Sequence, residues 1–293
     1  MRIKNSLISQ IRCTFTRLTI IFLGLSGLIG CSTTELIYDH ADWLIINRTN
    51  HYFDITSEQR SFLKNRLRDH LTWHRQSEMS LYAHFLLMFK AKAKNGLTEE
   101  ELDWAFDNFD ARRQVLFKRL LADTVYFLAM LKKDQIDHFE KTVIKDNQGP
   151  KVEKSPEKIK RQLEERADET IENMEDWFGR LSKAQIYRIR ALSMVLPDIK
   201  DDWANYRQMR RKEMITLLRE KKSPSEIEAH LKFWLFNPEV AYPPEYKEKF
   251  EQMEKATKTM ILQIDQLILP KQRERALKKL GGYIRDFQNL GRY

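Results

Sequence analysis

The chain contains little cysteine, little glycine and no apolar run long enough to span a bilayer. Of its 293 residues, two are cysteine and nine are glycine. Scarce glycine, together with the lack of any sustained alternation of apolar and polar residues, argues against a β-sheet protein. The apolar run Leu18–Ile29 has twelve residues, whereas a spanning helix needs roughly 20. The sequence therefore excludes a membrane-spanning bundle and favours helices.

The first 30 residues have the pattern of a secretory signal. Four basic residues and no acidic residue precede the apolar run, and Gly30 and Cys31 follow it. A basic segment, an apolar segment and a small residue at the cleavage site make up a signal peptide, which is removed from the mature protein. Residues 1–30 are predicted to be that signal. The alternatives are an ordinary signal peptide without lipid and an uncleaved anchor.

The order Leu28-Ile29-Gly30-Cys31 resembles a bacterial lipobox. The resemblance implies that Cys31 receives a diacylglycerol, becomes the first residue of the mature protein and is acylated on its amine. Each buried CH₂ of an acyl chain contributes ~0.8 kcal/mol, so two or three chains hold a protein on a membrane. Resemblance to lipoproteins also implies sorting by the next residue. Because this residue is Ser32 rather than aspartate, the predicted location is the periplasmic face of the outer membrane.

The remaining chain is mildly basic and lacks a thiol that could form a disulfide. Four of the 51 basic residues precede Cys31, which leaves 47 basic against 42 acidic residues, or +5. Such a surplus without clustering does not predict nucleic-acid binding. It fits attraction to anionic lipid, lipopolysaccharide or acidic clients, or simply a solvated surface. Cys13 leaves with the signal, so stability must come from the core.

Apolar residues recur at helical spacing throughout the chain, which predicts an all-α, multi-helix bundle. Polar residues that can cap helices precede several of these stripes. Thr56, Thr98, Ser182 and Ser223 are each followed three residues later by Gln or Glu, the pattern of a capping box. Ser155 before Pro156 predicts another start. "LKKDQI" has Gln135 but a lysine, Lys132, at the cap position.

These helix starts recur in the same order, at offsets of 126 and 125 residues, and Gln135 and Gln272 are 137 apart. The pattern predicts two duplicated helical halves, with chance recurrence of common caps as the alternative. The predicted boundaries are a signal at 1–30, a lipid-anchored tether at 31–54, half 1 at 55–147, a linker and connecting helix at 148–180, and half 2 at 181–293.

Two family resemblances follow from these residues. "YDHADWLIINRTNHYFDITSEQRSFLKNRL" resembles the amino-terminal stretch of a family of uncharacterised bacterial lipoproteins, a likeness that implies no known activity. "ITSEQ", "LSKAQ" and "LKKDQ" are similar to the Leu-Thr-x-x-Gln motif of Spy and CpxP, all-helical periplasmic stress proteins that hold unfolding clients in a curved dimeric cradle. This second likeness covers only the motif positions. It implies chaperone-like binding, with one chain supplying two halves.

No motif for nucleophilic catalysis, phosphate binding or a zinc hydrolase is present. His70 and His74, at i and i+4, could share a metal if Asp69 and Glu78 turned inward. The alternative, which the sequence favours, is a pair of partly exposed helix histidines beside a leucine stripe. No glutamate stands out as the acid of a cell-wall glycosidase. The prediction is therefore no catalytic, metal or cofactor site.

The segment "ELIYDHADWLII" permits two interpretations. Its polar residues Asp39, His40 and Asp42 could form a site. Alternatively, it is a short amphipathic helix that docks on the body. The apolar residues predicted to dock are Leu36, Trp43 and Leu44.

The tryptophans on the later stripes are predicted to lie in the core rather than on a client-binding surface. Taken together, the sequence predicts a non-catalytic lipoprotein that binds a protein, as a chaperone-like or assembly factor. A scaffold for one envelope complex and a cell-wall glycan enzyme are the alternatives.

Overall fold

The computed structural model describes residues 38–147 and 155–292. Every regular element within these ranges is a helix, which confirms the predicted all-α fold. The predicted signal, Cys31 and Ser32 lie outside the described residues. The elements in chain order are α4 (Ala41–Phe53), α5 (Ser57–Trp73), the π-helix η1 (His74–Glu78), α6 (Met79–Lys92), α7 (Glu99–Ala129), α8 (Lys133–Asn147), α9 (Pro156–Phe178), α10 (Lys183–Met194), α11 (Lys200–Arg219), α12 (Pro224–Phe236), the 3₁₀ helix η2 (Pro238–Ala241), α13 (Pro244–Leu267) and α14 (Pro270–Leu290).

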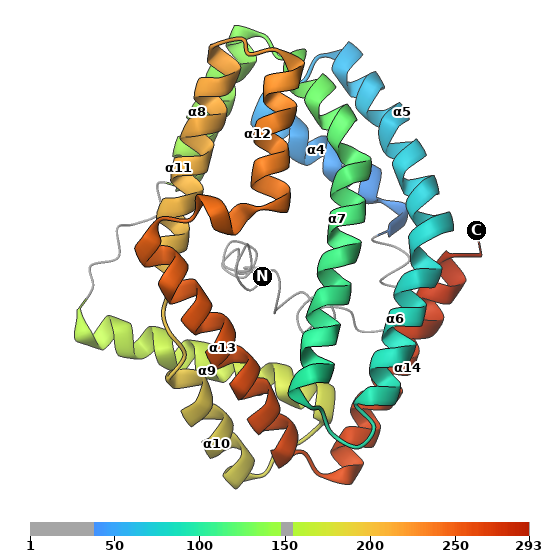
Figure 1. The fold of residues 1–293 in the computed structure, drawn as a ribbon, viewed down its shortest axis with the longest axis vertical. Coiled ribbons are helices and arrows are strands. Elements are labelled where there is room, and N and C mark those ends of the chain that lie inside the picture. Colours follow the sequence, from blue (N-terminus) through green and yellow to red (C-terminus); the bar gives the residue numbers. More distant parts are fainter. Residues whose placement is uncertain (1–37, 148–154, 293) are drawn as a thin grey trace, which may run out of the picture.

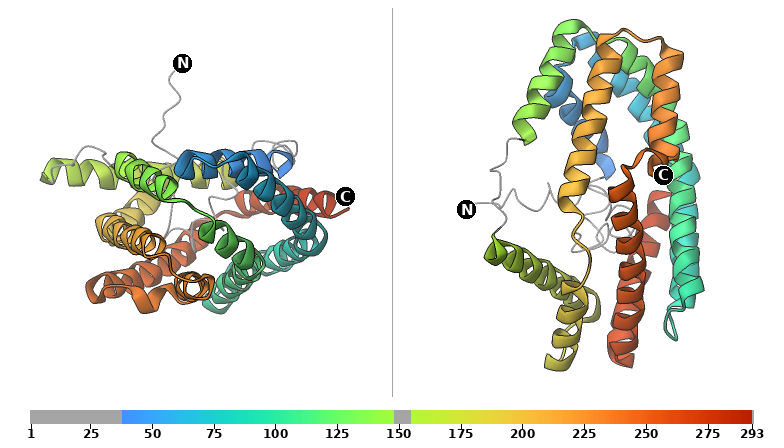
Figure 2. Two further views of the ribbon diagram at one scale, coloured as in Figure 1. Left: turned by 90° about the horizontal axis from the view of Figure 1, so that it is seen from above. Right: turned by 60° about the vertical axis from the view of Figure 1, so that its left-hand side comes forward.

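The helices form an elongated molecule (Figure 1). α5, η1 and α6 follow one another along one long edge, with α7 beside them. α8, α11 and α12 gather toward one end of the long axis, and α9 and α10 lie toward the other. The view from above in Figure 2 shows α4 and α9 on the face opposite to α12 and α13. None of the helices in the described ranges is both long and apolar enough to cross a membrane.

The predicted helix starts are confirmed. Thr56, Thr98, Ser182 and Ser223 each accept a hydrogen bond from the backbone N–H three residues on, and the Gln or Glu there bonds back to the cap N–H. Ser155 caps α9 before Pro156. At the degenerate start of α8, Gln135 still accepts the N–H of Lys132 at 3.1 Å. These bonds satisfy backbone donors that the first helical turn leaves free, so the starts are fixed locally.

The capping glutamines also join distant helices in pairs. Gln59 and Gln135 exchange amide hydrogen bonds of 3.0 and 2.7 Å, and both are buried. Gln185 and Gln272 exchange bonds of 2.7 and 3.3 Å. Each pair ties the start of one helix to the start of another, because the same oxygen that caps its own helix also receives the partner's amide. The two pairs mark equivalent places in the predicted halves.

Residues with a left-handed backbone recur at the same offset. Within the described ranges, positive φ is confined to Asp54, Gly96, Gly179 and Lys221. Asp54 and Gly179 are 125 residues apart, and so are Gly96 and Lys221. Non-glycine residues rarely adopt this conformation, and in each matched pair one of the two positions is such a residue. These positions support the duplication, which stays a prediction.

The helices of the two predicted halves interlock rather than form separate bodies. α6 packs along α14, α7 along α12, and α8 along α11. One core cluster accordingly joins Leu121 and Val125 of α7 to Leu217 of α11 and to Ile227 and Leu231 of α12. A second cluster joins α6, α9 and α14. Apolar burial therefore links the two halves directly.

The N-terminal amphipathic helix forms but docks through a different side from the one predicted. Trp43 is 61% exposed and Leu44 46% exposed, so the prediction that they pack on the body is wrong. Ile46 is the buried residue of α4, and Phe53 packs against the same core cluster. Leu36 lies outside the described residues. Bulk and hydrophobicity alone did not identify which side of this short helix faces the core.

The prediction that the tryptophans of the later stripes lie in the core holds for some of them. Trp177 is buried, and Trp203 and Trp234 pack partly buried against core clusters. Trp73 and Trp104, in contrast, are partly buried outside these clusters.

Candidate functional site

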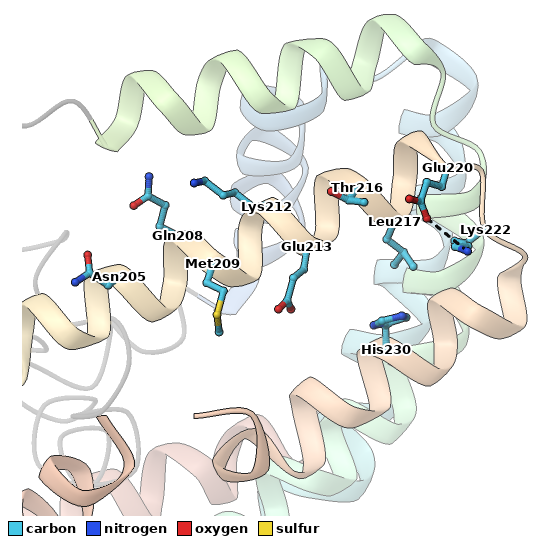
Figure 3. A pocket seen from close by; sticks show the side chains of 10 residues that line it. All are labelled: Asn205, Gln208, Met209, Lys212, Glu213, Thr216, Leu217, Glu220, Lys222 and His230. Atoms are coloured by element: carbon cyan, nitrogen blue, oxygen red, sulfur yellow. Dashed lines mark ion pairs between the residues drawn. The ribbon is translucent and has the colours of Figure 1, made fainter. Parts of the chain in front are cut away.

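A pocket of about 510 Å³ lies along α11, where the chain turns into α12 (Figure 3). Its lining residues on α11 recur every three or four positions, so they share one side of the helix. They begin at Asn205 and end at Glu220, which spans about 22 Å at 1.5 Å per residue. Lys222 from the α11–α12 turn and His230 from α12 complete the lining.

The floor of the pocket is apolar and its rim is charged. Met209 and Leu217 contribute carbon and sulfur atoms, and Leu217 belongs to the adjoining core. At one end, Lys222 forms ion pairs of 3.4 Å with Glu220 and 3.5 Å with Glu226. These carboxylates raise the pKa of the Lys222 amine. The flexible thioether of Met209 can adapt to side chains of different shape. The ion-paired residues at the rim would orient a bound group rather than react with it.

Arg210 fixes α11 against α12 beside the pocket. Its guanidinium lies 4.7 Å from the ring centre of Trp234, 5.7 Å from that of Phe233 and 5.4 Å from that of Tyr206. Its Nη1 donates to Glu213 at 2.6 Å. Cation–π contacts of this kind are strongest when the cation is withdrawn from water. The arrangement holds the Glu213 carboxylate, a pocket residue, in one orientation.

This pocket does not contain the carboxylate arrangement of a glycosidase. Glu213 and Glu220 both face cations, whereas a glycosidase needs one carboxylic acid that stays protonated opposite a carboxylate. An apolar floor with a charged rim instead suits a side chain or short segment of another protein.

A second polar cluster lies at the π-helix. The His74 ring lies between two phenols: Nδ1 is 3.2 Å from the Tyr38 hydroxyl, and Nε2 is 3.1 Å from the Tyr82 hydroxyl. Tyr38 donates to the carbonyl of Leu71 at 2.9 Å. Burial raises the pKa of Tyr82 to about 12 and lowers the pKa of His74. Both groups are therefore neutral near pH 7, and the cluster holds the start of the described chain against η1.

The extra residue of the π-turn explains this contact. In an uninterrupted α-helix, residues eight apart are rotated by about 80° from each other. Because the π-turn holds one additional residue, the eight positions from His74 to Tyr82 correspond to seven positions of a regular α-helix. This places Tyr82 on the same side of the helix as His74. π-bulges are common where a side chain must be redirected. The buried Glu78 ends the same turn and pairs with Arg112 at 3.4 Å.

The two histidines considered as metal ligands face different partners. His70 Nε2 lies 2.6 Å from Asp123 on α7, and this carboxylate also accepts from Arg66 at 2.9 Å. His70 is buried rather than partly exposed as the sequence suggested. No group of three or more potential metal ligands occurs in the described part of the chain. The structure brings His70 and His74 to separate hydrogen-bond networks.

The polar residues of the first segment are not gathered into a site either. Asp39 pairs with Arg75 at 3.1 Å, and Asp42 accepts the N–H of Trp43 at 2.7 Å. His40 precedes α4 without bonding to it through its side chain. These contacts fix the entry into α4.

We expect acidification to destabilise the fold in part through His74. Because burial lowers its pKa below 6.5, the unfolded chain takes up a proton that the native ring does not. Stability from the neutral ring is present above about pH 6.5 and is lost as the pH falls below it. Urea unfolding at pH 7.5 and 5.5 should show a smaller loss of unfolding free energy for His74→Gln than for the unaltered chain. Equal losses would contradict this role.

The fold and the pocket define a class: an all-helical protein with an apolar-floored pocket between two helices. Residues 51–247 match the family described as a family of unknown function (DUF6279), and because this is more than half of the chain, the protein belongs to that family. No curated protein and no solved structure matches the chain. The likeness to Spy and CpxP proteins thus stays a prediction.

Sequence analysis did not identify the pocket residues. The segment from Asn205 to Glu220 carries polar residues on more than one side, so no single stripe stood out. The one available signal was the position of Met209 among charged residues at helical spacing. Cys31, the predicted lipid attachment site, lies outside the described residues.

Proposed function

We propose that the protein is a lipid-anchored envelope protein that binds a protein partner or client, without catalysis, through the pocket between α11 and α12. The observation that carries the proposal is the combination of the apolar floor at Met209 and Leu217 with a charged rim. Binding sites on proteins typically join apolar contact with a few polar groups that orient the ligand.

The dimensions of the pocket fit an amphipathic helix. The α11 lining extends over about 22 Å, and apolar anchors at i, i+3, i+4 and i+7 of a docked helix span about 10 Å. Lys212 and Glu213 offer charges of both signs beside the floor. An apolar stripe flanked by charged residues would therefore meet complementary groups, which favours a protein segment over a small apolar ligand.

The proposed anchor is the lipid on Cys31, with the body on the periplasmic face of the outer membrane. It rests on the lipobox-like order before Cys31 and on Ser32 after it. Intact-mass analysis of the membrane-extracted protein should show a diacylglycerol and an acyl chain on residue 31. The Cys31→Ala variant should lose these masses and leave the membrane fraction. An unmodified Cys31 would overturn the anchor without affecting the pocket.

Filling the pocket tests the binding function. Thr216 lines the pocket and is exposed, so Thr216→Trp should occupy the space without disturbing the core. We expect the purified chain to slow aggregation of an unfolded client at near-stoichiometric amounts without nucleotide, and Thr216→Trp to lose most of this effect. Thr259→Trp, on an exposed position of α13 outside the pocket, is the matched control.

Two results would contradict the proposal. One is an unaltered chain that fails to slow aggregation over a range of salt concentrations and also captures no protein in crosslinking. The other is equal activity of the Thr216→Trp and Thr259→Trp variants. Crosslinking that yields one stoichiometric partner, lost in Thr216→Trp, would support the pocket and identify a scaffold rather than a general chaperone.

A further inference from the structure

The exposed side of α14 carries unpaired positive charge. Lys271, Arg275, Lys278 and Arg285 are all exposed and fall at helical spacing. None of these four forms an ion pair within the described residues. Glu274 is the one acidic residue among the exposed positions of this helix. The stripe therefore gathers four cations on one side of a single helix.

Two glycines let a cation from α6 join this stripe. A Cβ atom on Gly281 would lie 3.0 Å from Nζ of Lys90 and 3.8 Å from Nη1 of Arg285. These two distances limit the separation of the two cationic atoms to 6.8 Å. A Cβ atom on Gly282 would also lie 3.9 Å from Nη2 of Arg285. We call the line of contact between α6 and α14 the α6–α14 seam. Because Gly281 and Gly282 have no side chains, the cations of Lys90 and Arg285 can come close to each other on this seam.

Neither cation has an acidic partner there. No hydrogen bond or ion pair of Lys90 or Arg285 occurs in the described part of the chain. Two like charges this close repel each other, and an anion between them would turn this repulsion into attraction. Phosphate oxygens are among the acceptors with which Lys and Arg side chains form short, charge-assisted hydrogen bonds.

An apolar side chain borders the cation on α6. Leu87 is 50% exposed and lies one helical turn before Lys90 on the same side. α6 packs along α14, as Figure 1 shows. Surfaces that lie on a bilayer combine exposed apolar residues with Lys and Arg that reach the phosphates. A free phosphate ion would make no use of this apolar residue.

The start of the described chain lies close to this surface. Tyr38 stacks on His74, the His74 ring contacts Tyr82, and the Tyr82 ring lies 5.9 Å from that of Phe287 on α14. Tyr38 is seven positions after Cys31 in the sequence, a reach of at most about 25 Å. A chain end held here can be tethered to a membrane that also contacts α6 and α14.

We infer that the α6–α14 face docks on the headgroups of an anionic phospholipid bilayer, with a lipid phosphate between Lys90 and Arg285 and with Leu87 at the headgroup level. This inference goes beyond the protein-binding proposal, and its tether argument rests on the lipid anchor proposed for Cys31. The docking orients the body, so that α12, which lies toward the other end of the long axis from α14 in Figure 1, remains accessible.

Vesicle flotation of the unlipidated chain tests this inference. The chain from residue 31 onward, with Cys31→Ser, contains every core cluster described above. We expect it to float with vesicles of phosphatidylglycerol and phosphatidylcholine at 3:7 and not with phosphatidylcholine alone. The double variant Lys90→Gln/Arg285→Gln, which removes both seam cations, should bind the vesicles at least tenfold more weakly. Each cation near an anionic surface raises the affinity for the membrane about fivefold.

The matched control is Lys247→Gln/Lys255→Gln, which removes two exposed cations from α13. It should bind vesicles as the unaltered chain does, and thermal unfolding should show both double variants folded. Loss of binding in both variants to the same degree would indicate attraction by net charge alone. It would overturn the inference that Lys90 and Arg285 bind a lipid phosphate. Binding of inorganic phosphate by calorimetry without flotation on anionic vesicles would also overturn the proposed bilayer contact.

Discussion

Replacing Gln135 by alanine is expected to lower the free energy of unfolding by about 3 kcal/mol. Its amide donates to the carbonyls of Phe53 and Asp54 at 3.1 Å, and its oxygen accepts from Gln59 and from the N–H of Lys132. The side chain is buried, so its loss leaves several polar groups without partners and without water. Each such group costs about 1–3 kcal/mol, only part of which the cavity can relieve by admitting solvent. Equilibrium urea unfolding measures the effect.

The second glutamine pair supplies the control. Gln272 makes the corresponding bonds to Gln185 and to the carbonyl of Arg180, but it is only partly buried. Gln272→Ala should therefore cost less, about 1 kcal/mol. A double-mutant cycle on Gln59 and Gln135 should show a coupling of about 1 kcal/mol or more. A loss below about 0.5 kcal/mol for Gln135→Ala, the level of an ordinary surface substitution, would show that the pair does not hold the helices together.

Replacing Asp265 by alanine is expected to destabilise the fold by about 3 kcal/mol. Its carboxylate accepts from Arg273 at 2.7 Å and from the N–H of Leu97 at 2.9 Å. Arg273 also donates to the carbonyl of Ala93. The pair therefore clamps the α6–α7 turn to the α13–α14 turn, and both side chains are largely buried, at 11% and 16% exposure. Removing the acid leaves the guanidinium buried without its counter-charge.

An exposed ion pair provides the comparison for this clamp. Asp168 pairs with Arg190 at 2.6 Å, but the two side chains are 57% and 37% exposed. Asp168→Ala should cost less than about 1 kcal/mol, because water and salt screen the pair. Thermal and urea unfolding of both variants, at low and moderate salt, separate the two cases. Equal losses for Asp168→Ala and Asp265→Ala would contradict the proposed importance of burial.

The helix starts could be predicted from the sequence because they depend on few neighbouring residues. Thr56 and Gln59, or Ser182 and Gln185, satisfy each other's backbone within one turn. No distant contact is needed to recognise them. The amide exchange between Gln59 and Gln135 spans 76 residues, and nothing in either motif indicates its partner. The sequence therefore predicted the caps and their recurrence but not the pairing.

The incorrect predictions arose where a helix face had to be assigned. Trp43 and Leu44 were expected to dock because they are large and apolar, yet α4 buries Ile46 on another side. His70 and His74 share a helix face in principle, but His70 reaches Asp123 on α7. A π-turn has no clear sequence signature, so the position of Tyr82 beside His74 could not be derived from regular spacing.

The electropositive seam did have a signal in the sequence. Two adjacent glycines inside a helix cost about 1 kcal/mol each relative to alanine, and "KKLGGYIRDF" places them in the middle of α14. Such a pair indicates close approach of another element. What approaches, here Lys90 from α6, depends on packing between helices that are almost 200 residues apart.

The interlocking of α6 with α14 and of α8 with α11 has a consequence for how the chain acquires its structure. Several helix–helix contacts join distant parts of the sequence, because α6 finds its packing partner only after α14 has been made. Folding rates fall as contacts become less local. A nascent chain that lacks residues 270–290 would expose the apolar side of α6, so C-terminal truncation should leave an aggregation-prone species rather than a smaller folded domain.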